Sequence, residues 1–383
     1  MVTAFFEIVF FATIFLCLST YVGYPLIIWI AGELFPFKAE KSDFAPYVSI
    51  IISAFNEGKS LRRKLVNTLA LDYPRDRLEI LLGSDGSNDE TRWIGEEFVT
   101  HGIKFYHFSE NRGKTAVQND LVKESNGTLL VFTDAASFMS PDALRKIVAN
   151  FADSRVGCVG ATLSFIGTKR NLTAQSQGIY WKYESRIREM ESKIGSLIGV
   201  DGPLYAIRKE AYVHLESDAI SDLLSPLLVL EKGWKVVLEE GAKVDEEIKN
   251  TRNAEFRTRR RIVSRGFLGI WKVVWLLNVK RNPKLALQII FHKLIRWLVG
   301  PLLLLNVMAC IALINRFPFN AFLVVYFYIL IFGAIGLVLE RLQIKSKVLS
   351  VAFYFLLVNI AATMGLVDFL RRKKAVSWVP VRD

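Results

Sequence analysis

Residues 47–58 read YVSIIISAFNEG, and this stretch decides the fold. Tyr47 to Ser53 form a short continuous run rich in β-branched residues, which is typical of a strand buried inside a parallel sheet. The run stops at Ala54, and the polar residues that follow predict a turn. We therefore expect the chain to fold around a parallel sheet that begins here.

The same pattern continues as far as residue 137. It predicts further strands at residues 78–82, 103–108 and 128–133 and helices at residues 60–71, 90–99 and 114–124. Such alternation is typical of the α/β class with a mostly parallel, doubly wound sheet. Ligands of these sheets bind outside the carboxyl ends of the strands.

Polar side chains follow three of the expected strands. Asn56 and Glu57 follow the first strand, Asp85 and Ser87 follow the second, and Asp134 closes the fourth. We expect these residues to meet in one crevice. No G-x-G-x-x-G and no G-x-x-x-x-G-K-[ST] sequence occurs, which argues against a dinucleotide site of the usual kind and against a P-loop.

Asp134 ends an apolar strand and suits a hard divalent cation, because Mg²⁺ binds one or two carboxylates together with substrate phosphates. The alternative is that Asp134 caps the helix expected near Pro141 or only ends its strand. The three cysteines and four histidines are scattered and include no C-x-x-C, so neither a zinc site nor a disulfide framework is indicated.

The apolar residues are concentrated in four segments. The chain has 383 residues, 52% hydrophobic and 22% charged, with a net charge of +12. No charge occurs in residues 8–32, 297–315, 317–339 and 348–367. A bilayer core about 30 Å thick needs about 20 apolar helical residues, so we expect four membrane helices, the first an anchor too long for a signal-peptide core. This excludes a disordered chain, a small disulfide scaffold and an ordinary cytosolic enzyme.

Basic residues flank the membrane segments and predict their orientation. Lys38 and Lys41 after the first segment, and Lys284, Lys293 and Arg296 before the second, place the block between them in the cytoplasm. Three further spans would put the C-terminus outside, whereas the basic cluster at residues 371–374 favours the inside. Either one of the last segments is re-entrant, or this basic cluster does not determine the side on which the C-terminus lies.

Six motifs follow one another in a characteristic order: VSIIISAFNE (48–57), SDGSND (84–89), RGK (112–114), FTDA (132–135), VDGPLYAIR (200–208) and SD (221–222). Together they resemble the membrane-anchored glycosyltransferases of family 2, which include hyaluronan, chitin, poly-N-acetylglucosamine and cellulose synthases and many exopolysaccharide transferases. The resemblance covers residues 45–300 and implies a GT-A fold and a hexosyltransferase activity of class EC 2.4.

The resemblance also implies how the chain is divided. We expect an N-terminal membrane helix, a GT-A domain, Arg-rich and amphipathic interface helices, about three C-terminal membrane helices and a basic tail, at residues 1–35, 45–250, 251–296, 297–370 and 371–383. The protein is then a multi-pass protein of the plasma (inner) membrane with a cytoplasmic catalytic domain.

A UDP-sugar donor is implied by the resemblance. Its binding residues are expected to be Asn56, Glu57, Asp85, Ser87, Lys114, Asp134 and Arg261, with Asp85 at the nucleobase. The D-x-D motif, which binds the divalent cation (Mg²⁺ or Mn²⁺) in the family, reads Asp134-Ala135-Ala136 here and lacks its second acid. Asp134 is then the metal ligand, alone with water and phosphate or helped by Ser137, and weak metal affinity is expected.

Asp222 stands where the family has its catalytic base. A carboxylate within hydrogen-bond reach of the attacking hydroxyl can take its proton as the new bond forms, and direct displacement at the anomeric carbon inverts its configuration. The alternative for Asp222 is a cap of the helix that follows.

The Q-x-x-R-W motif of processive members corresponds to residues 258–262, where Arg261 keeps the basic position and Gln and Trp are absent. Arg suits a diphosphate through its bidentate fork, whereas the missing pair argues against long-chain processivity. The alternative for this Arg-rich segment is a basic face against anionic lipid headgroups.

Acceptor-binding residues are expected at Trp181, Asp201, Gly202 and Arg259. Residues 180–191 predict an amphipathic helix whose aromatic side chains stack on a sugar or pack against the sheet. Residues 267–277 predict an interfacial helix that holds the active site against the membrane.

The sequence therefore favours an inverting transferase that acts on a polysaccharide or lipid-linked acceptor beside membrane lipids, with a dimer or an export partner as a further expectation. A polyprenyl-phosphate sugar transferase and an inactive scaffold subunit of a polysaccharide export complex remain alternatives. The lack of ionisable residues in the four charge-free runs argues against a transporter, and the absence of a reader motif argues against nucleic-acid binding.

Overall fold

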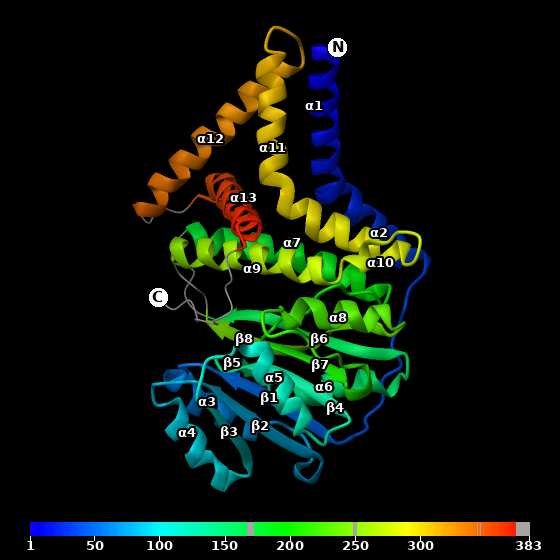
Figure 1. Cartoon of the computed structure of the whole chain (residues 1–383), viewed down its shortest axis with the longest axis vertical. Coiled ribbons are helices and arrows are strands. Elements are labelled where there is room, and N and C mark those ends of the chain that lie inside the picture. Colours follow the sequence, from blue (N-terminus) through cyan, green and yellow to red (C-terminus); the bar gives the residue numbers. More distant parts are fainter. Residues whose placement is uncertain (167–171, 248–250, 343, 345, 373–383) are drawn as a thin grey trace.

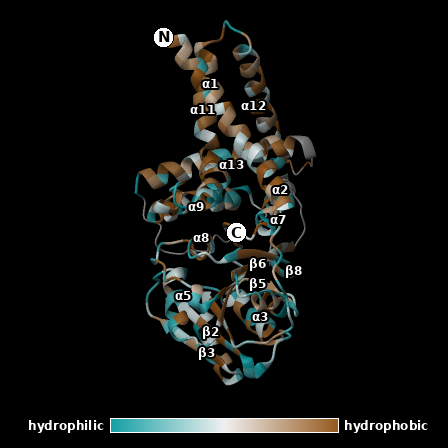
Figure 2. Ribbon diagram, turned by 90° about the vertical axis from the view of Figure 1, so that its right-hand side faces the viewer, coloured by the Kyte–Doolittle hydropathy of each residue, from teal (hydrophilic) through white to brown (hydrophobic). Residues whose placement is uncertain are grey.

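The computed structural model describes residues 1–166, 172–247, 251–342, 344 and 346–372. Three layers follow one another along its long axis: an α/β domain, a set of crosswise helices and a set of upright helices (Figure 1). The upright helices are strongly hydrophobic and the far end of the α/β domain is largely hydrophilic (Figure 2). Most of the expected basic tail, residues 373–383, lies outside the described residues.

The described residues form one sheet of eight strands in the order β3-β2-β1-β4-β7-β6-β8-β5. Their bounds are Val48–Ala54 (β1), Leu78–Asp85 (β2), Ile103–Phe108 (β3), Leu129–Asp134 (β4), Ser137–Met139 (β5), Val156–Ile166 (β6), Leu204–Arg208 (β7) and Lys235–Glu247 (β8). The first four are parallel neighbours, as the sequence predicts. Strand β7 pairs antiparallel with β4 and β6, so the sheet is mixed but mostly parallel.

Helices cover both faces of this sheet. On one face, β1 and β4 pack against α3 (Gly58–Leu69), α4 (Thr91–Glu97) and α6 (Ala143–Ala149). On the other face they pack against α5 (Lys114–Lys123) and α8 (Ser221–Glu231). The predicted doubly wound arrangement is therefore confirmed. Every residue of β1 is buried, which explains why its apolar residues point to both faces of the sheet instead of alternating with exposed polar ones.

The crosswise layer contains α2 (Tyr24–Leu34), α7 (Leu172–Lys193), α9 (Arg252–Lys272) and α10 (Pro283–Gln288) (Figure 1). Apolar side chains join α2 to α7, and α8 to the end of α9 and to α10. Above this layer stand α1 (Val2–Leu18), α11 (Ile295–Ala312) and α12 (Phe319–Arg341) (Figure 1).

Four stretches are long and apolar enough to span a membrane: Val2–Leu34, Pro283–Ala312, Phe319–Arg341 and Leu349–Leu370. Each of the first two joins an upright helix to a crosswise one through a π-helical turn, at residues 19–23 and 289–294. Bends at π-helical turns are common. Only part of each stretch is therefore upright (Figure 1).

The last helix, α13 (Lys347–Leu370), packs along α9. Its Tyr354 donates a hydrogen bond to Glu255 of α9 (2.6 Å), and its Asp368 forms a two-pronged ion pair with Arg260. Gly333 and Gly336 of α12 lie against Leu356 and Phe353 of α13. Helix α13 therefore lies between the upright helices and α9.

Candidate active site

The carboxyl ends of the central strands lie side by side. The register pairs Ser53 of β1 with Asp134 of β4, and Ala54 of β1 with Ser84 of β2. The loops after β1 and β2 are tied together, because the Asn56 N–H donates to Ser87 Oγ (3.1 Å) and the Asn88 N–H to Asn56 Oδ1 (2.9 Å). Asn56 takes a left-handed conformation (φ 53°), which Asn tolerates better than most residues.

Asp85 is buried, with 1% of its surface exposed. Its two carboxylate oxygens accept the main-chain N–H groups of Arg112 (2.8 Å) and Gly113 (2.9 Å). Burial raises the pKa of this carboxyl, and these hydrogen bonds and the Arg112 charge oppose the rise. Asp85 therefore fixes the loop that leads to Lys114, a positioning contact in addition to the predicted contact with the nucleobase.

Asp134 forms an ion pair with Lys114, the first residue of α5. Lys64 of α3 fixes the loop that follows Asp134. It is fully buried and donates to Thr133 Oγ1 and to the Ser137 carbonyl (both 2.7 Å). The Ser137 hydroxyl is buried and donates to the main-chain oxygen of Asp134 (2.9 Å). In this geometry the Ser137 hydroxyl is therefore not placed to help Asp134 bind a metal ion.

A divalent cation would find a small set of ligands here. Among the described residues, no three His, Cys, Asp or Glu side chains form a group that could hold a metal ion. One carboxylate is enough for Mg²⁺ or Mn²⁺ when substrate phosphates supply further oxygens. The residues therefore fit an ion that binds together with the donor diphosphate at Asp134.

Asp222 lies in the first turn of α8 and is partly buried. Ile220 caps this helix and Asp222 makes no capping bond, so the capping alternative is wrong. A Cβ atom on Gly202 would lie 2.8 Å from Asp222 Oδ2 and 3.5 Å from Lys114 Nζ. Glycine at position 202 thus lets the main chain approach both charged groups.

Burial raises the pKa of Asp222 above its usual range. The neighbouring carboxylates of Asp134 and Asp201 add to the rise, and the charges of Lys114 and Arg265 oppose it. A partly buried carboxylate with a raised pKa, close to a second carboxylate that can face a phosphate, is an arrangement suited to general-base chemistry.

A pocket of about 360 Å³ begins at Asp134 and Asp222 and extends to the apolar helices α11 and α13. It brings together seven of the predicted site residues: Asp134, Trp181, Asp201, Gly202, Asp222, Arg259 and Arg261. Asn56, Glu57, Asp85, Ser87 and Lys114 do not line it. They lie at the adjoining strand ends and at the start of α5, so the predicted donor residues form a second group beside the pocket.

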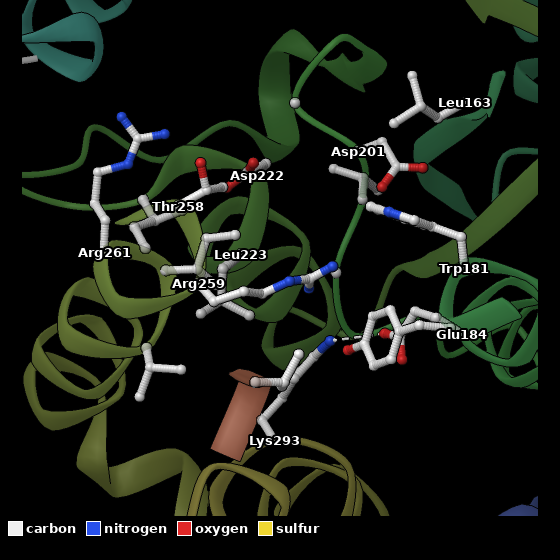
Figure 3. A pocket seen from close by; sticks show the side chains of 18 of the residues that line it. Leu163, Trp181, Glu184, Asp201, Asp222, Leu223, Thr258, Arg259, Arg261 and Lys293 are labelled. Carbon is white, nitrogen blue, oxygen red and sulfur yellow. Dashed lines mark hydrogen bonds and ion pairs between the residues drawn. The ribbon is translucent and has the colours of Figure 1, made fainter. Parts of the chain in front are cut away.

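Figure 3 shows the side chains of Arg259 and Lys293 reaching into this pocket. Arg259 is positioned by three helices, because it bonds Glu255 on α9 (2.8 Å) and Tyr354 on α13 (3.1 Å) and stacks over Tyr180 on α7. Burial lowers the pKa of Arg261, and the nearby carboxylates of Asp222 and Asp134 oppose this.

The acceptor side of the pocket has donors without partners. Trp181 Nε1 and Thr258 Oγ1 are buried and have no hydrogen-bond partner in the part of the chain that the structure describes. Asp201 is held in an ion pair by Arg188. Buried donors of this kind fit the hydroxyl groups of a sugar.

The sequence did not reveal a buried ionic cluster behind the pocket. His292 lies between the carboxylates of Glu191 (2.6 Å) and Glu184 (3.1 Å), and Glu184 also binds Arg296 and faces Lys293 at 3.5 Å. The charges on α7 were expected on an amphipathic helix, but Glu184 and Glu191 are buried. The spacing of His292 and Arg296, four residues apart on one helical face, was the available signal.

Residues 49–215 match the family model described as glycosyl transferase family 2. Poly-beta-1,6-N-acetyl-D-glucosamine synthase of Staphylococcus epidermidis is 26% identical over 206 residues, which cover 49% of this chain and 49% of that protein. Residues 49–215 therefore form a domain of the glycosyl transferase family 2 type. The beta-monoglucosyldiacylglycerol synthase of Synechocystis is 22% identical over 265 residues, 66% of this chain and 55% of that protein. The chain thus spans about half the length of these relatives.

One solved structure matches nearly the whole chain. Mannosyltransferase PcManGT from Pyrobaculum calidifontis, solved with GDP-mannose and Mn²⁺, has a TM-score of 0.75 and 18% sequence identity and covers 96% of this chain and 100% of that protein. This likeness shows that the family 2 domain and the apolar helices together form a fold that occurs elsewhere. The GT-A-like fold predicted from the sequence is therefore confirmed.

Proposed function

We propose that this protein transfers a sugar from a UDP-sugar to a hydroxyl group of a lipid-linked or polysaccharide acceptor, with inversion of the anomeric configuration. The observation that carries this proposal is the course of the pocket. It connects Asp134 and Asp222 at the strand ends with Trp297 of α11 and Val358 and Ala362 of α13. An acceptor bound there reaches the donor from the membrane side.

In this mechanism Asp222 accepts the proton of the acceptor hydroxyl while that oxygen bonds to the anomeric carbon. The bond from this carbon to the donor phosphate breaks, and its electrons leave with the nucleoside diphosphate. Lys114 and Arg261 carry the positive charge that stabilises the leaving diphosphate. A divalent ion at Asp134 would supply further positive charge there.

The aromatic side chains, and the polar groups that lack hydrogen-bond partners among the described residues, suit a glycan. Trp181 and Tyr180 offer ring faces and Trp181 Nε1 offers a hydrogen bond. Arg188, Arg259 and Arg296 each already contact a carboxylate. The pocket is therefore better suited to a sugar hydroxyl than to the bare phosphate of a polyprenyl phosphate.

Release of nucleoside diphosphate from a panel of UDP-sugars and GDP-mannose tests this proposal. Detergent-purified protein with Mg²⁺ or Mn²⁺ is expected to use one UDP-sugar, with turnover that depends on added membrane lipid extract. Turnover that polyprenyl phosphate alone supports would overturn the glycan acceptor. No donor binding and no turnover with any sugar would indicate an inactive scaffold.

For the topology we propose that α1, α11 and α12 cross the membrane and that α13 does not. Helix α11 rises away from the sheet, α12 returns toward it, and the N-terminus lies at the far end (Figure 1). Helix α13 is bound along α9 through polar contacts on the sheet side. The C-terminal basic residues then lie on the cytoplasmic side, which removes the conflict that the sequence left open.

Labelling with a membrane-impermeant maleimide in intact cells tests this topology, in a background in which Cys17 is replaced by Ser. Asn315→Cys, in the loop between α11 and α12, is expected to react from outside. Arg372→Cys and the control Lys59→Cys, in the sheet domain, are expected to react only after permeabilisation. Reaction of Arg372→Cys in intact cells would mean that α13 spans the membrane.

A further inference from the structure

A second cavity, of about 1020 Å³, lies at the bend between α1 and α2 and shares no lining residue with the first pocket. Its walls are mainly apolar and come from the end of α1, from α2, from α10 and from the turn at residues 289–294: the side chains include Phe15, Leu18, Ile27, Leu287 and Phe291. Its size is at the upper end of ordinary ligand sites.

The cavity exists because the first helix bends. The π-helical turn at residues 19–23 changes the helix direction, and Thr20 donates a hydrogen bond to the Phe291 carbonyl from across the bend. Tyr24 is bonded to the buried Glu191 just beyond the turn. The bend is thus fixed by contacts outside the helix, so the cavity is preformed.

One end of this cavity carries positive charge. Lys235, Lys284 and Arg155 line it there, beside the ring of Phe37. Arg155 and Lys235 lie over this ring, at 4.9 and 5.7 Å from its centre. Gly195 is in the left-handed region (φ 62°), and a Cβ there would meet Phe37 and Lys235 at about 3 Å. The charged end is therefore closely packed.

These charges are only partly neutralised. Arg155 is paired with Asp153, whereas neither Lys235 nor Lys284 forms an ion pair with an acidic side chain among the residues described. Lys284 donates to the Ile194 carbonyl (3.0 Å), and the two lysines are near enough to repel each other. The charge of Glu191 acts on Lys284 without forming an ion pair. Two cations without an ion-pair partner at the end of an apolar cavity fit an anionic headgroup followed by an acyl chain.

We propose that this cavity binds an anionic phospholipid of the leaflet on the sheet side, with its phosphate at Lys235 and Lys284 and an acyl chain along the bend of α1 and α2. Charge complementarity selects this occupant over a neutral lipid. The site is separate from the catalytic pocket, which Asp222 lines and which none of these lysines reaches. The lipid would stabilise the packing of α2 against α7 rather than serve as a sugar acceptor.

The test is the melting temperature of the detergent-purified full chain, titrated with phosphatidylglycerol or phosphatidylcholine in mixed micelles. Phosphatidylglycerol is expected to raise Tm more than phosphatidylcholine does, and high salt is expected to remove the difference. In the double variant Lys235→Gln/Lys284→Gln the apparent affinity for phosphatidylglycerol is expected to fall roughly thirtyfold, because each charge near a lipid surface strengthens binding about fivefold.

The matched control is Lys59→Gln/Lys123→Gln, which removes two exposed lysines of the sheet domain and is expected to retain the full response. If the double variant is less stable, native mass spectrometry measures its lipid binding instead, because this method counts the lipids bound to folded protein. An equal rise with both lipids would overturn the headgroup site, and so would a full response in Lys235→Gln/Lys284→Gln. Neither readout uses sugar transfer, so this result is independent of the proposed function.

Discussion

Replacing Asp222 by Asn is expected to lower kcat about 10³-fold, within the range that a positioned general base contributes. The same change is expected to leave Tm unchanged or to raise it. Burial raises the pKa of this carboxyl, which means that its ionised form is disfavoured in the folded protein. Above that pKa the charge costs stability, and a neutral amide of the same shape removes the cost. Initial rates and a melting curve of the same preparation check both parts.

The pH profile gives a second readout for Asp222. A base must be ionised, so kcat/KM is expected to fall as the pH drops through a pKa that lies above the usual 3.8. Glu216→Gln is the matched control, because Glu216 precedes the same helix with an exposed side chain paired to Lys272. Wild-type turnover in Asp222→Asn would remove Asp222 from the mechanism.

Replacing Glu184 by Gln is expected to destabilise the protein by about 3–5 kcal/mol, the usual cost of removing one partner of a buried ion pair. Burial alone would raise the pKa of Glu184, but the charges of His292, Arg296 and Lys293 outweigh it and hold the pKa well below its usual range. A neutral amide at position 184 leaves His292, Arg296 and Lys293 without the negative charge that faces them. The melting temperature at neutral pH measures the effect.

The sign of the pH dependence follows from the lowered pKa. The stabilisation by Glu184 is complete above the ordinary pKa of a glutamate and is lost as the pH falls through the lower pKa of the folded protein. Glu189→Gln is the control on the same helix, since Glu189 forms a surface pair with Arg186 that is expected to contribute only about 0.2–1 kcal/mol. Equal melting temperatures of the two variants would contradict a stabilising role for the cluster.

The sheet could be predicted from the sequence because its signals are local. The β-branched run of β1 and the polar residues after it lie within 12 residues, and the register then brings Asp134 beside Ser53. The same locality makes Asp222 and Gly202 recognisable as parts of motifs. Their closeness to each other follows only from the fold, in which Val200 donates a main-chain hydrogen bond to the Asp222 carbonyl.

The membrane end of the pocket could not be predicted in this way. Lys293 and Arg296 indicated the orientation of a membrane segment, whereas in the structure they also line the pocket. Arg296 meets Glu184, 112 residues earlier in the chain, and no local pattern pairs positions so far apart. The bends at residues 19–23 and 289–294 were missed for a related reason, since contacts with distant segments hold them.

Helix α13 has a further consequence, which concerns the order of synthesis. The sheet, α7, α8, α9 and α11 all precede residue 347 in the chain, while Val358 and Ala362 complete the pocket wall. During translation Asp134 and Asp222 are therefore synthesised before the helix that completes the pocket wall. The pocket is complete only when α13 docks on Glu255 and Arg260, so a nascent chain that lacks this helix has a pocket with an open wall.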